Sequence, residues 1–407
     1  MLSLGILFLG RRICMFKKFV LFLLATAAFN VSAAGWKREN PEKYWDFEKL
    51  KNAPGYREAT EIESQSANLK ALYLKGYGAA PGDKTISTGN PNPMSKKVPA
   101  EFFVYYGEPA GKVPEGGFPG IVLIHGGGGT AYPQFVKRWI AKGYAVIALD
   151  WYNQRPSVKN DNVDKKRIPL SGGRRHDHVA NVANMVLCHS FLRAQKNVNP
   201  EKTAFVGLSW GSWYGAMLAA VDNRFKGGIE IYCGYIKKET SFINGRFHHA
   251  IKVPMFWVVG TNDQNMTLAS VAEAYKECPT TVTKSQVIRL PHAHVGFNFD
   301  SCARMAEYFT RGGVCLPVLA DLTVNGNIAS AKIMGTGKGI KYAILCYTDS
   351  AEKKYHKRLW KSVPAIIKDG VISAEIPNGA HQFYISAYDG KGKYNDLCGS
   401  TAVYIKK

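Results

Sequence analysis

A serine flanked by two glycines stands where the chain is expected to turn sharply from a strand into a helix. Residues 207–211 read Gly-Leu-Ser-Trp-Gly, with Ser209 at the centre. The apolar run 204–208 leads into this motif, and residues 212–220 follow it with helical spacing. Such a turn exposes the serine hydroxyl and needs glycines, because Cβ atoms would clash there. The spacing predicts that Ser209 is a catalytic nucleophile.

A run of glycines upstream is suited to holding negative charge. Residues 125–129 read His-Gly-Gly-Gly-Gly and follow the apolar run 121–124. Backbone N–H donors aimed at an oxyanion typically stabilise a transition state by about 2.7 to 4 kcal/mol each. We expect the N–H groups of Gly127, Gly128 and Trp210 to form an oxyanion hole. A phosphate-binding loop is the weaker interpretation, because the run lacks the Lys-Ser/Thr ending of a P-loop and the spacing of a dinucleotide-binding loop.

A carboxylate that could orient a catalytic base follows a later apolar run. Asp263 comes directly after residues 255–259, in the turn Gly-Thr-Asn-Asp. Asp150, which ends the run 144–149, is the alternative, but it precedes the serine. Hydrolases built around such a serine turn order their triad as serine, acid, histidine. We therefore expect Asp263 to be the acid, with helix capping as its structural alternative.

Two histidines compete for the role of the base. His292 and His294 both follow the run 286–290, within the segment Pro-His-Ala-His. We favour His294, because it lies further into the loop and precedes Val-Gly-Phe, and similar hydrolases place the base just before a glycine and an aromatic residue. Residues near the predicted site that are expected to contact substrate are His125, Tyr152, Trp213 and His292.

The elements that would position these residues alternate between strands and helices from residue 99 to 313. Short apolar runs predict strands at 102–106, 121–124, 144–149, 204–208, 228–232, 255–259 and 286–290. Helical spacing predicts helices at 132–142, 179–194, 212–220, 268–275 and 302–310. This alternation is typical of an α/β fold with a mostly parallel central sheet flanked by helices.

The chain on either side of this region differs from it in composition and in its predicted secondary structure. Residues 35–98 are polar and rich in Pro and Gly, and we interpret them as an N-terminal extension in which 71–77 could begin an antiparallel edge to the sheet. From 314 to 407, strand-like runs at 319–324, 342–347, 382–388 and 402–405 are separated by turn residues. The pattern predicts a small C-terminal β-sandwich-like domain.

Taken together, these motifs resemble a known family. The segments 125–132, 145–150, 207–211, 221–226, 260–263 and 291–294 are similar to those of acetylxylan-esterase-like members of the dienelactone hydrolase and prolyl oligopeptidase superfamily of α/β-hydrolases. The resemblance covers residues 99–312. It implies an exported carboxylic-ester hydrolase that deacetylates polysaccharides or oligosaccharides with a Ser-His-Asp triad and without a metal or organic cofactor. Aromatic residues that could then stack on sugar faces are Tyr152, Trp210, Trp213 and Tyr214.

Two other functions are less consistent with the sequence. A peptidase of the prolyl oligopeptidase superfamily would need a large N-terminal propeller, for which residues 35–98 are too few. A catalytically silent glycan-binding protein would not need a serine, an acid and a histidine in catalytic order.

The first 34 residues predict export. Basic pairs at 11–12 and 17–18 precede the apolar run 19–29 and the small residues 32–34, which is the layout of a signal peptide that starts at Met1 or Met15. The run is too short to span a bilayer of roughly 30 Å. We therefore expect a secreted or periplasmic protein with no stable membrane insertion after removal of the signal.

The net charge of +22 bears on which partners the protein could bind. The basic residues are scattered and accompany no nucleic-acid-binding motif, so a nucleic-acid partner is not expected. A solvated basic surface is the simplest interpretation, and an anionic glycan is the alternative. The loop 151–175, rich in Lys and Arg, departs from the resembled family and favours the anionic substrate.

Cysteines 188, 233, 278, 302, 315, 346 and 398 lie beyond the signal. Export permits disulfides, with Cys346 and Cys398 able to pair and Cys278, Cys302 and Cys315 offering a second bridge. No spacing typical of metal ligands is present, and the pairs His176/His178 and His248/His249 lack an evident third ligand, so no metal is expected.

Overall fold

The computed structural model describes residues 38–62, 67–156, 167–170, 176–234 and 241–406. The predicted signal peptide and much of the basic loop 151–175 lie outside these residues. In the part of the chain described, no helix is long and apolar enough to cross a membrane.

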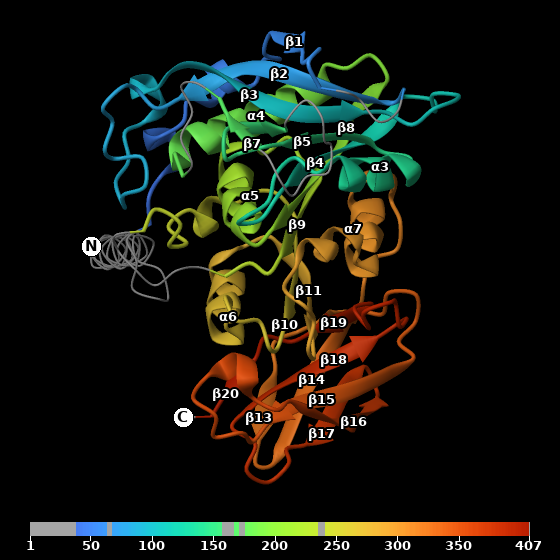
Figure 1. Ribbon diagram of the computed structural model, residues 1–407. Helices are drawn as coiled ribbons and strands as arrows, with labels where there is room; N and C mark the ends of the chain where they lie inside the picture. The colour runs from blue at the N-terminus through green and yellow to red at the C-terminus, as the bar shows by residue number, and fades with distance from the viewer. Residues whose placement is uncertain (1–37, 63–66, 157–166, 171–175, 235–240, 407) are drawn as a thin grey trace, which may run out of the picture.

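A large mixed sheet forms the first layer of the molecule (Figure 1). Its strands, in spatial order, are β1 (Tyr56–Glu58), β2 (Leu69–Gly78), β3 (Val98–Gly107), β5 (Ala145–Leu149), β4 (Phe118–Ile124), β8 (Val198–Leu208), β9 (Gly227–Ile231), β10 (Met255–Gly260) and β11 (Thr281–Val287). From β5 to β11 all neighbours are parallel, whereas β1, β2 and β3 add an antiparallel edge. The parallel strands bring their carboxyl ends to one edge of the sheet, which is where ligands bind in open α/β folds.

Helices cover both faces of this sheet. The longer ones are α3 (Pro133–Ala141), α4 (His178–Arg193), α5 (Trp210–Val221), α6 (Leu268–Glu277) and α7 (Asp300–Arg311). Figure 1 shows α3 and α7 on one side of the sheet, and α5 and α6 on the other. Single turns add α2 (Phe47–Leu50) and the 3-10 helices η1 (Pro41–Lys43), η2 (Met94–Lys96), η3 (His248–Ala250), η4 (His294–Asn298) and η5 (Tyr355–Lys357).

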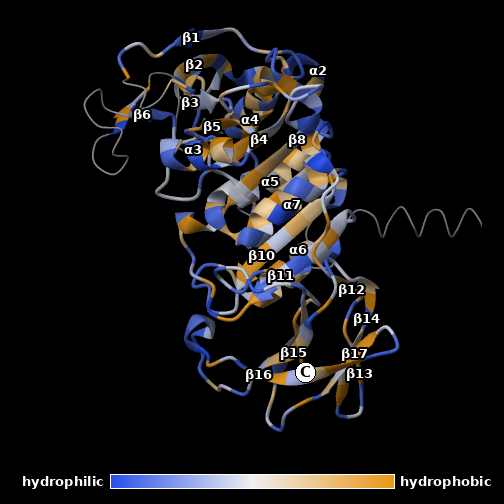
Figure 2. Ribbon diagram, turned by 90° about the vertical axis from the view of Figure 1, so that its right-hand side faces the viewer, coloured by the Kyte–Doolittle hydropathy of each residue, from blue (hydrophilic) through white to orange (hydrophobic). Residues whose placement is uncertain are grey.

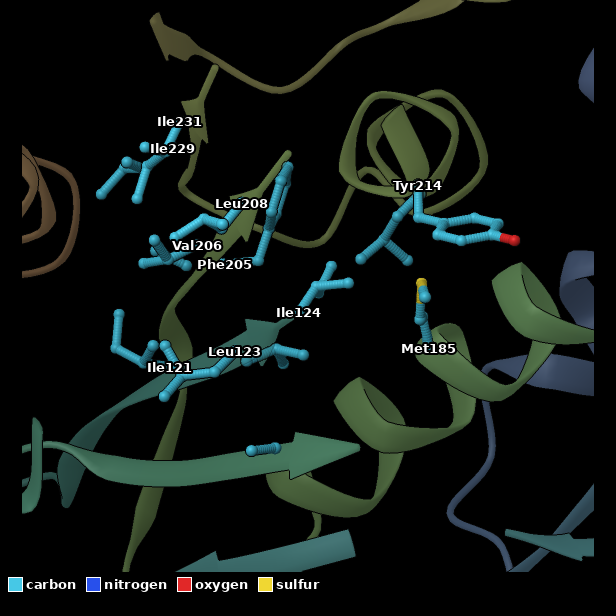
Figure 3. Close-up of a cluster of buried hydrophobic side chains, with 14 of the residues drawn as sticks. Ile121, Leu123, Ile124, Met185, Phe205, Val206, Leu208, Tyr214, Ile229 and Ile231 are labelled. Atoms are coloured by element: carbon cyan, nitrogen blue, oxygen red, sulfur yellow. The ribbon is translucent and has the colours of Figure 1, made fainter. Parts of the chain in front are cut away.

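The central strands are buried on both faces, which explains their nearly continuous apolar sequence. Every residue of β4, β5, β9 and β10 is buried. Figure 3 shows side chains of β4, β8 and β9 packed together, with Met185 of α4 and Tyr214 of α5 against them. In Figure 2 the apolar residues follow these strands through the interior. This core holds the strand ends, and hence the motifs that follow them, at fixed positions.

The N-terminal residues belong to the same layer. Strand β2 pairs antiparallel with β3 along its whole length, so the prediction of an antiparallel edge at 71–77 is confirmed. Upstream, the indole N–H of Trp45 donates to the carbonyl of Val179 in α4, at 2.9 Å. Because Trp45 is buried, this segment packs onto the helical face rather than trailing away from it.

The C-terminal residues form a second, antiparallel sheet around a separate core (Figure 1). Its strands are β12 (Val318–Leu319), β13 (Thr323–Asn325), β14 (Ile328–Gly335), β15 (Tyr342–Thr348), β16 (Lys361–Lys368), β17 (Val371–Glu375), β18 (Gln382–Tyr388), β19 (Cys398–Ser400) and β20 (Tyr404–Ile405). Strand β16 pairs with β15 through residues 361–365 and with β17 through residues 366–368. The sheet therefore turns a corner at β16 and curls toward a barrel.

Buried hydrogen bonds join the two sheets at β11. The side chain of Ser285 donates to the carbonyl of Cys398, and the backbone N–H of Gln286 donates to Ser400 Oγ at 3.0 Å. The amide of Gln286 also donates to the carbonyl of Thr401, at 2.7 Å. Because buried polar groups without partners are costly, these bonds fix the position of the C-terminal domain on the β11 edge of the large sheet.

The cysteines form no disulfide in the described chain. All seven of them are free thiols, and all except Cys315 are buried. Neither the possible bridge between Cys346 and Cys398 nor a second one among Cys278, Cys302 and Cys315 is therefore observed. Cys346 and Cys398 both lie inside the C-terminal domain, where burial raises the pKa of each thiol to about 12. They act there as small apolar side chains.

Candidate active site

The serine turn predicted from the sequence is present between β8 and α5. Ser209 has φ +56° and ψ −116°, a backbone conformation that non-glycine residues rarely adopt. Its N–H donates to the carbonyl of Ile231 at 2.8 Å, which ties the turn to the neighbouring strand. A Cβ at Gly211 would lie 2.1 Å from the carbonyl oxygen of Ile124, and one at Gly207 would lie 2.5 Å from the carbonyl oxygen of Gly211. The strained turn therefore requires both glycines of the motif.

His292 connects the serine to the acid. Its Nε2 lies 2.9 Å from Ser209 Oγ, and its Nδ1 lies 2.6 Å from Asp263 Oδ2. An ionised carboxylate can only accept, so Nδ1 carries the proton and Nε2 is free to accept one from the serine hydroxyl. The ring of Tyr232 stacks on the imidazole at 4.3 Å, with 22° between the planes. The hydroxyl of Tyr232 also donates to the carbonyl of Pro291, so one side chain fixes both the ring and the loop that carries it.

Asp263 is buried and oriented by its own loop. Its Oδ1 accepts the N–H groups of Asn265 at 2.8 Å and Met266 at 2.9 Å, which leaves Oδ2 for the histidine. The alternative acid, Asp150, has other partners: it accepts the hydroxyl of Thr130 and the N–H of Tyr152. The geometry thus places Asp263, and not Asp150, behind the histidine.

The structure contradicts the expectation that His294 is the base. Strand β11 ends at Val287, three residues earlier than the sequence predicts, and Arg289 turns the chain with φ +57°. His292 is therefore already deep enough in the loop to reach Ser209, while His294 begins the 3-10 helix η4. The ring of His294 instead packs on Tyr132 with centroids 4.8 Å apart.

The environment of His294 also makes it a poor proton acceptor. Burial, followed by the positive charge of Arg167, lowers the pKa of His294 to about 4. Its Nε2 has no hydrogen-bond partner among the described residues. A Cβ at Gly129 would lie 2.6 Å from that atom, so the ring lies directly against the glycine run.

The glycine run lies beside the serine turn, but its three predicted oxyanion donors are not equivalent. A Cβ at Gly126 would lie 3.2 Å from Ser209 Cβ, and one at Gly127 would lie 2.7 Å from the Trp210 ring. The N–H of Gly128 donates to the hydroxyl of Tyr152 at 2.6 Å, so the expectation that Gly128 holds the oxyanion is contradicted. For the N–H groups of Gly127 and Trp210, the described part of the chain shows no intramolecular acceptor.

His125 packs against the start of this run. Its ring is buried and stacks on Trp151 at 4.9 Å. Its Nδ1 lies 2.8 Å from the carbonyl of Gly126, and its Nε2 accepts the N–H of Trp151 at 3.2 Å. These partners require a neutral imidazole with the proton on Nδ1. A contact of His125 with substrate stays a prediction.

Aromatic side chains form one wall beside the serine. Trp210 is half-buried and contacts Trp213 and His176, each with ring centroids 4.7 Å apart. Trp213 is 8% exposed, Tyr152 is 5% exposed and Tyr214 is fully buried. Of the four aromatic residues expected to stack on sugars, Trp210 alone offers a substantial face. Tyr152 instead anchors Gly128, a role that no sequence pattern signals.

The remaining histidine pairs do not build a metal site within the described residues, where no group of three or more His, Cys, Asp and Glu side chains could hold an ion. His178 lies 3.1 Å from the hydroxyl of Tyr214, and burial lowers the pKa of His178 to about 3. His248 is buried against Trp257, and burial lowers its pKa to about 4. Both rings act as neutral packing groups.

The part of the chain that holds this site matches a known family. Residues 102–310, just over half of the chain, match the model of the dienelactone hydrolase family. No curated protein matches the sequence. Among solved structures, similar ones include an acetyl xylan esterase from Paenibacillus sp. R4, with a TM-score of 0.47, 12% identity and coverage of 66% of this chain and 98% of the other. Another is acetyl xylan esterase 1 from Thermoanaerobacterium sp. JW/SL YS485, with a TM-score of 0.44, 14% identity and coverage of 69% and 94%. A third is described as a putative dienelactone hydrolase from Klebsiella pneumoniae, with a TM-score of 0.39, 13% identity and coverage of 57% and 95%.

Proposed function

Because the chain belongs to the dienelactone hydrolase family, we propose that it is a serine carboxylic-ester hydrolase in which Ser209, His292 and Asp263 form the catalytic triad. One observation carries the proposal: Ser209 Oγ, the His292 ring and the buried Asp263 carboxylate form a continuous hydrogen-bonded chain of 2.9 and 2.6 Å. The order of the three residues along the sequence is also the order that this fold uses.

The acylation step follows from these positions. Ser209 Oγ attacks the ester carbonyl as its proton moves to His292 Nε2, and the buried carboxylate of Asp263 stabilises the resulting imidazolium. The N–H groups of Gly127 and Trp210 hold the tetrahedral oxyanion. His292 then returns the proton to the departing alcohol oxygen, which leaves an acyl group on Ser209.

Deacylation repeats the same chemistry with water. His292 Nε2 removes a proton from the water that attacks the acyl carbonyl, and gives it to Ser209 Oγ as the carboxylic acid leaves. Each proton enters and leaves through the same ring nitrogen. The reaction therefore needs the neutral Nδ1-protonated form of His292 that its partners specify.

For the substrate we propose an acylated, anionic glycan. Arg167 lies beside the site and donates to the carbonyl of Gly128 at 3.0 Å, which places a cation next to the glycine run. Exposed Lys353, Lys354 and Lys357 lie in the C-terminal segment that contacts the loop carrying Asp263. With the net charge of +22, these cations favour a polyanion over a neutral polymer. An exported protein would meet such a glycan outside the cytoplasm, and the N-terminal residues predict export.

The nucleophile is tested by covalent labelling. The protein is treated with a fluorophosphonate, and the adduct is mapped by mass spectrometry, with Ser209→Ala and the buried neighbour Ser212→Ala as matched variants. We expect a single adduct on Ser209, its loss together with hydrolysis of p-nitrophenyl acetate in Ser209→Ala, and labelling retained in Ser212→Ala. An adduct on another residue, or full activity of Ser209→Ala, would refute the proposal.

A further inference from the structure

The C-terminal domain contacts the loop that carries the catalytic acid. The side-chain amide of Asn262, the residue before Asp263, donates to the carbonyl of His356 at 2.8 Å and to the carbonyl of Arg358 at 2.9 Å. On the other side of the acid, the carbonyl of Gln264 accepts the hydroxyl of Tyr355 at 2.6 Å. Residues 352–358, which we name the brace segment, therefore hold both neighbours of Asp263.

The amide of Asn262 is fully engaged in this contact. Its two hydrogens reach the brace segment, and its oxygen accepts the hydroxyl of Thr261 at 2.8 Å. An amide has two donor hydrogens and one acceptor oxygen, so this side chain links three points at once. The link is directional, because each hydrogen bond weakens steeply when its angle or length changes. Small movements of the acid loop relative to the brace segment are thereby opposed.

The brace segment is itself anchored within the C-terminal domain. The guanidinium of Arg358 donates to the carbonyl of Glu352 at 2.9 Å and closes the segment into a compact turn. Directly after it, the carbonyl of Leu359 accepts the hydroxyl of the buried Thr348 at 2.8 Å, and the buried ring of Trp360 contacts that of Tyr384 with centroids 5.6 Å apart. Because the domain is also bonded to β11, the segment is held from two directions.

The acid loop is in turn coupled to the loop that carries the base. The N–H of Thr261 donates to the carbonyl of Val287, the last residue of β11, at 2.9 Å. Thr261 Oγ1 accepts the N–H of Arg289 at 3.2 Å. The chain from Thr261 to Asp263 and the chain from Val287 to His292 thus share one hydrogen-bonded frame, and the brace segment stabilises that frame from outside the catalytic sheet.

From these contacts we propose that the C-terminal β-domain positions the triad acid, with Asn262 and Tyr355 as the positioning residues. This inference rests on the proposed function, since it concerns the same triad. Asp263 Oδ2 must stay 2.6 Å from His292 Nδ1 to orient the ring and to stabilise its protonated form. A displacement of about 1 Å at a catalytic group can cost about 100-fold in rate. The domain therefore acts on the reaction through the brace segment and the position of the acid, and no residue of its described part, 314–406, hydrogen-bonds to Ser209, His292 or Asp263.

The test compares Asn262→Ala and Tyr355→Phe with Tyr342→Phe in the full-length protein. Tyr342 is the matched control, because its hydroxyl donates to Asn395 of the same domain at 3.2 Å and to no other residue that the structure describes. We expect kcat for p-nitrophenyl acetate to fall about 10- to 100-fold in Asn262→Ala and several-fold in Tyr355→Phe, with KM nearly unchanged. Tyr342→Phe is expected to match the wild type.

The pH profile distinguishes positioning from general loss of structure. When the carboxylate is less well aligned, protonated His292 is less stable, so the acidic limb of kcat/KM should move to lower pH in both variants. If Asn262→Ala does not fold, as judged by circular dichroism, Tyr355→Phe alone decides. Wild-type kcat and an unchanged profile in the folded variants would overturn the inference. A wild-type protein that hydrolyses no ester and takes up no fluorophosphonate would instead overturn the proposed function.

Discussion

Replacing His292 and His294 separately tests the assignment of the base. His292 makes the bonds to Ser209 and Asp263, whereas His294 lies against Tyr132. Without the His292 ring, the serine hydroxyl has no acceptor for its proton. We expect His292→Ala to lower kcat by about 10⁴- to 10⁶-fold, as for loss of other triad bases. That loss corresponds to about 5 to 8 kcal/mol of transition-state stabilisation.

His294→Ala should have a much smaller effect. The substitution removes a ring that packs on Tyr132 and on the glycine run, so we expect a modest loss of stability and a decrease in kcat of no more than about tenfold. The ring cannot substitute for His292, because it contacts neither Ser209 nor Asp263 and its lowered pKa makes it a weak base. The two variants differ by two positions in one loop and therefore control for each other.

The assay is steady-state hydrolysis of p-nitrophenyl acetate, with folding checked by circular dichroism and thermal unfolding. His292→Gln is a third variant that keeps side-chain bulk under the ring of Tyr232 while removing the basic nitrogen. It should be as inactive as His292→Ala. If folded His292→Ala retains more than a tenth of the wild-type kcat, or if His294→Ala is the inactive variant, the reasoning from the hydrogen bonds is wrong.

Three further outcomes are expected. Gly211→Ala should prevent folding or lower the melting temperature strongly, because the added Cβ would clash with the carbonyl oxygen of Ile124. The control is Gly55→Ala, whose added Cβ would meet the flexible side chain of Lys75, so this variant should unfold at nearly the wild-type temperature. The carboxylate of Asp83 accepts a hydrogen bond from the ammonium of buried Lys97. Burial raises the pKa of Asp83, but hydrogen bonds from Thr85 and Lys97 outweigh it and lower that pKa from an ordinary 3.8 to about 2. The ionised carboxylate therefore stabilises the fold at neutral pH. Acid titrations of unfolding should show that this stabilisation is lost as pH falls from about 4 to about 2. Lys97→Met should lower the free energy of unfolding by about 3 to 5 kcal/mol at pH 7. Finally, added salt should lower kcat/KM for an acetylated anionic glycan far more than kcat/KM for p-nitrophenyl acetate, because the electrostatic screening length is about 8 Å at physiological ionic strength. Parallel salt dependences would show that the charge does not act in recognition.

Short sequence patterns predicted the turn at Ser209, the place of Asp263 and most of the sheet, because the contacts that fix these features involve residues close together in the sequence or at the ends of strands. The motif around Ser209 carries its own reason for being a strained turn, since its glycines are required by contacts within the turn and with the adjacent strand. Asp263 could be chosen because a parallel sheet brings the ends of its strands together. The apolar runs predicted β4, β5, β8, β9 and β10, because strands buried on both faces are mostly apolar. The run at 286–290 overlaps only the end of β11, whose buried residues include Thr283, Ser285 and Gln286.

Other features depended on contacts between residues far apart in the sequence. The choice between His292 and His294 depends on where β11 ends, and that end is set by pairing with β10 and by the bonds from Gln286 to the C-terminal domain, residues that no local pattern links. The loss of Gly128 as an oxyanion donor depends on the hydroxyl of Tyr152, 24 positions away. The sequence by itself determined the strained turn at Ser209, the place of Asp263 at a strand end and the α/β layer, because each follows from short-range sterics and burial. Only the tertiary structure decided which histidine hydrogen-bonds to Ser209 and which distant domain contacts the loop of Asp263, because a hydrogen bond depends on position within fractions of an ångström. That position is the outcome of packing across the whole chain.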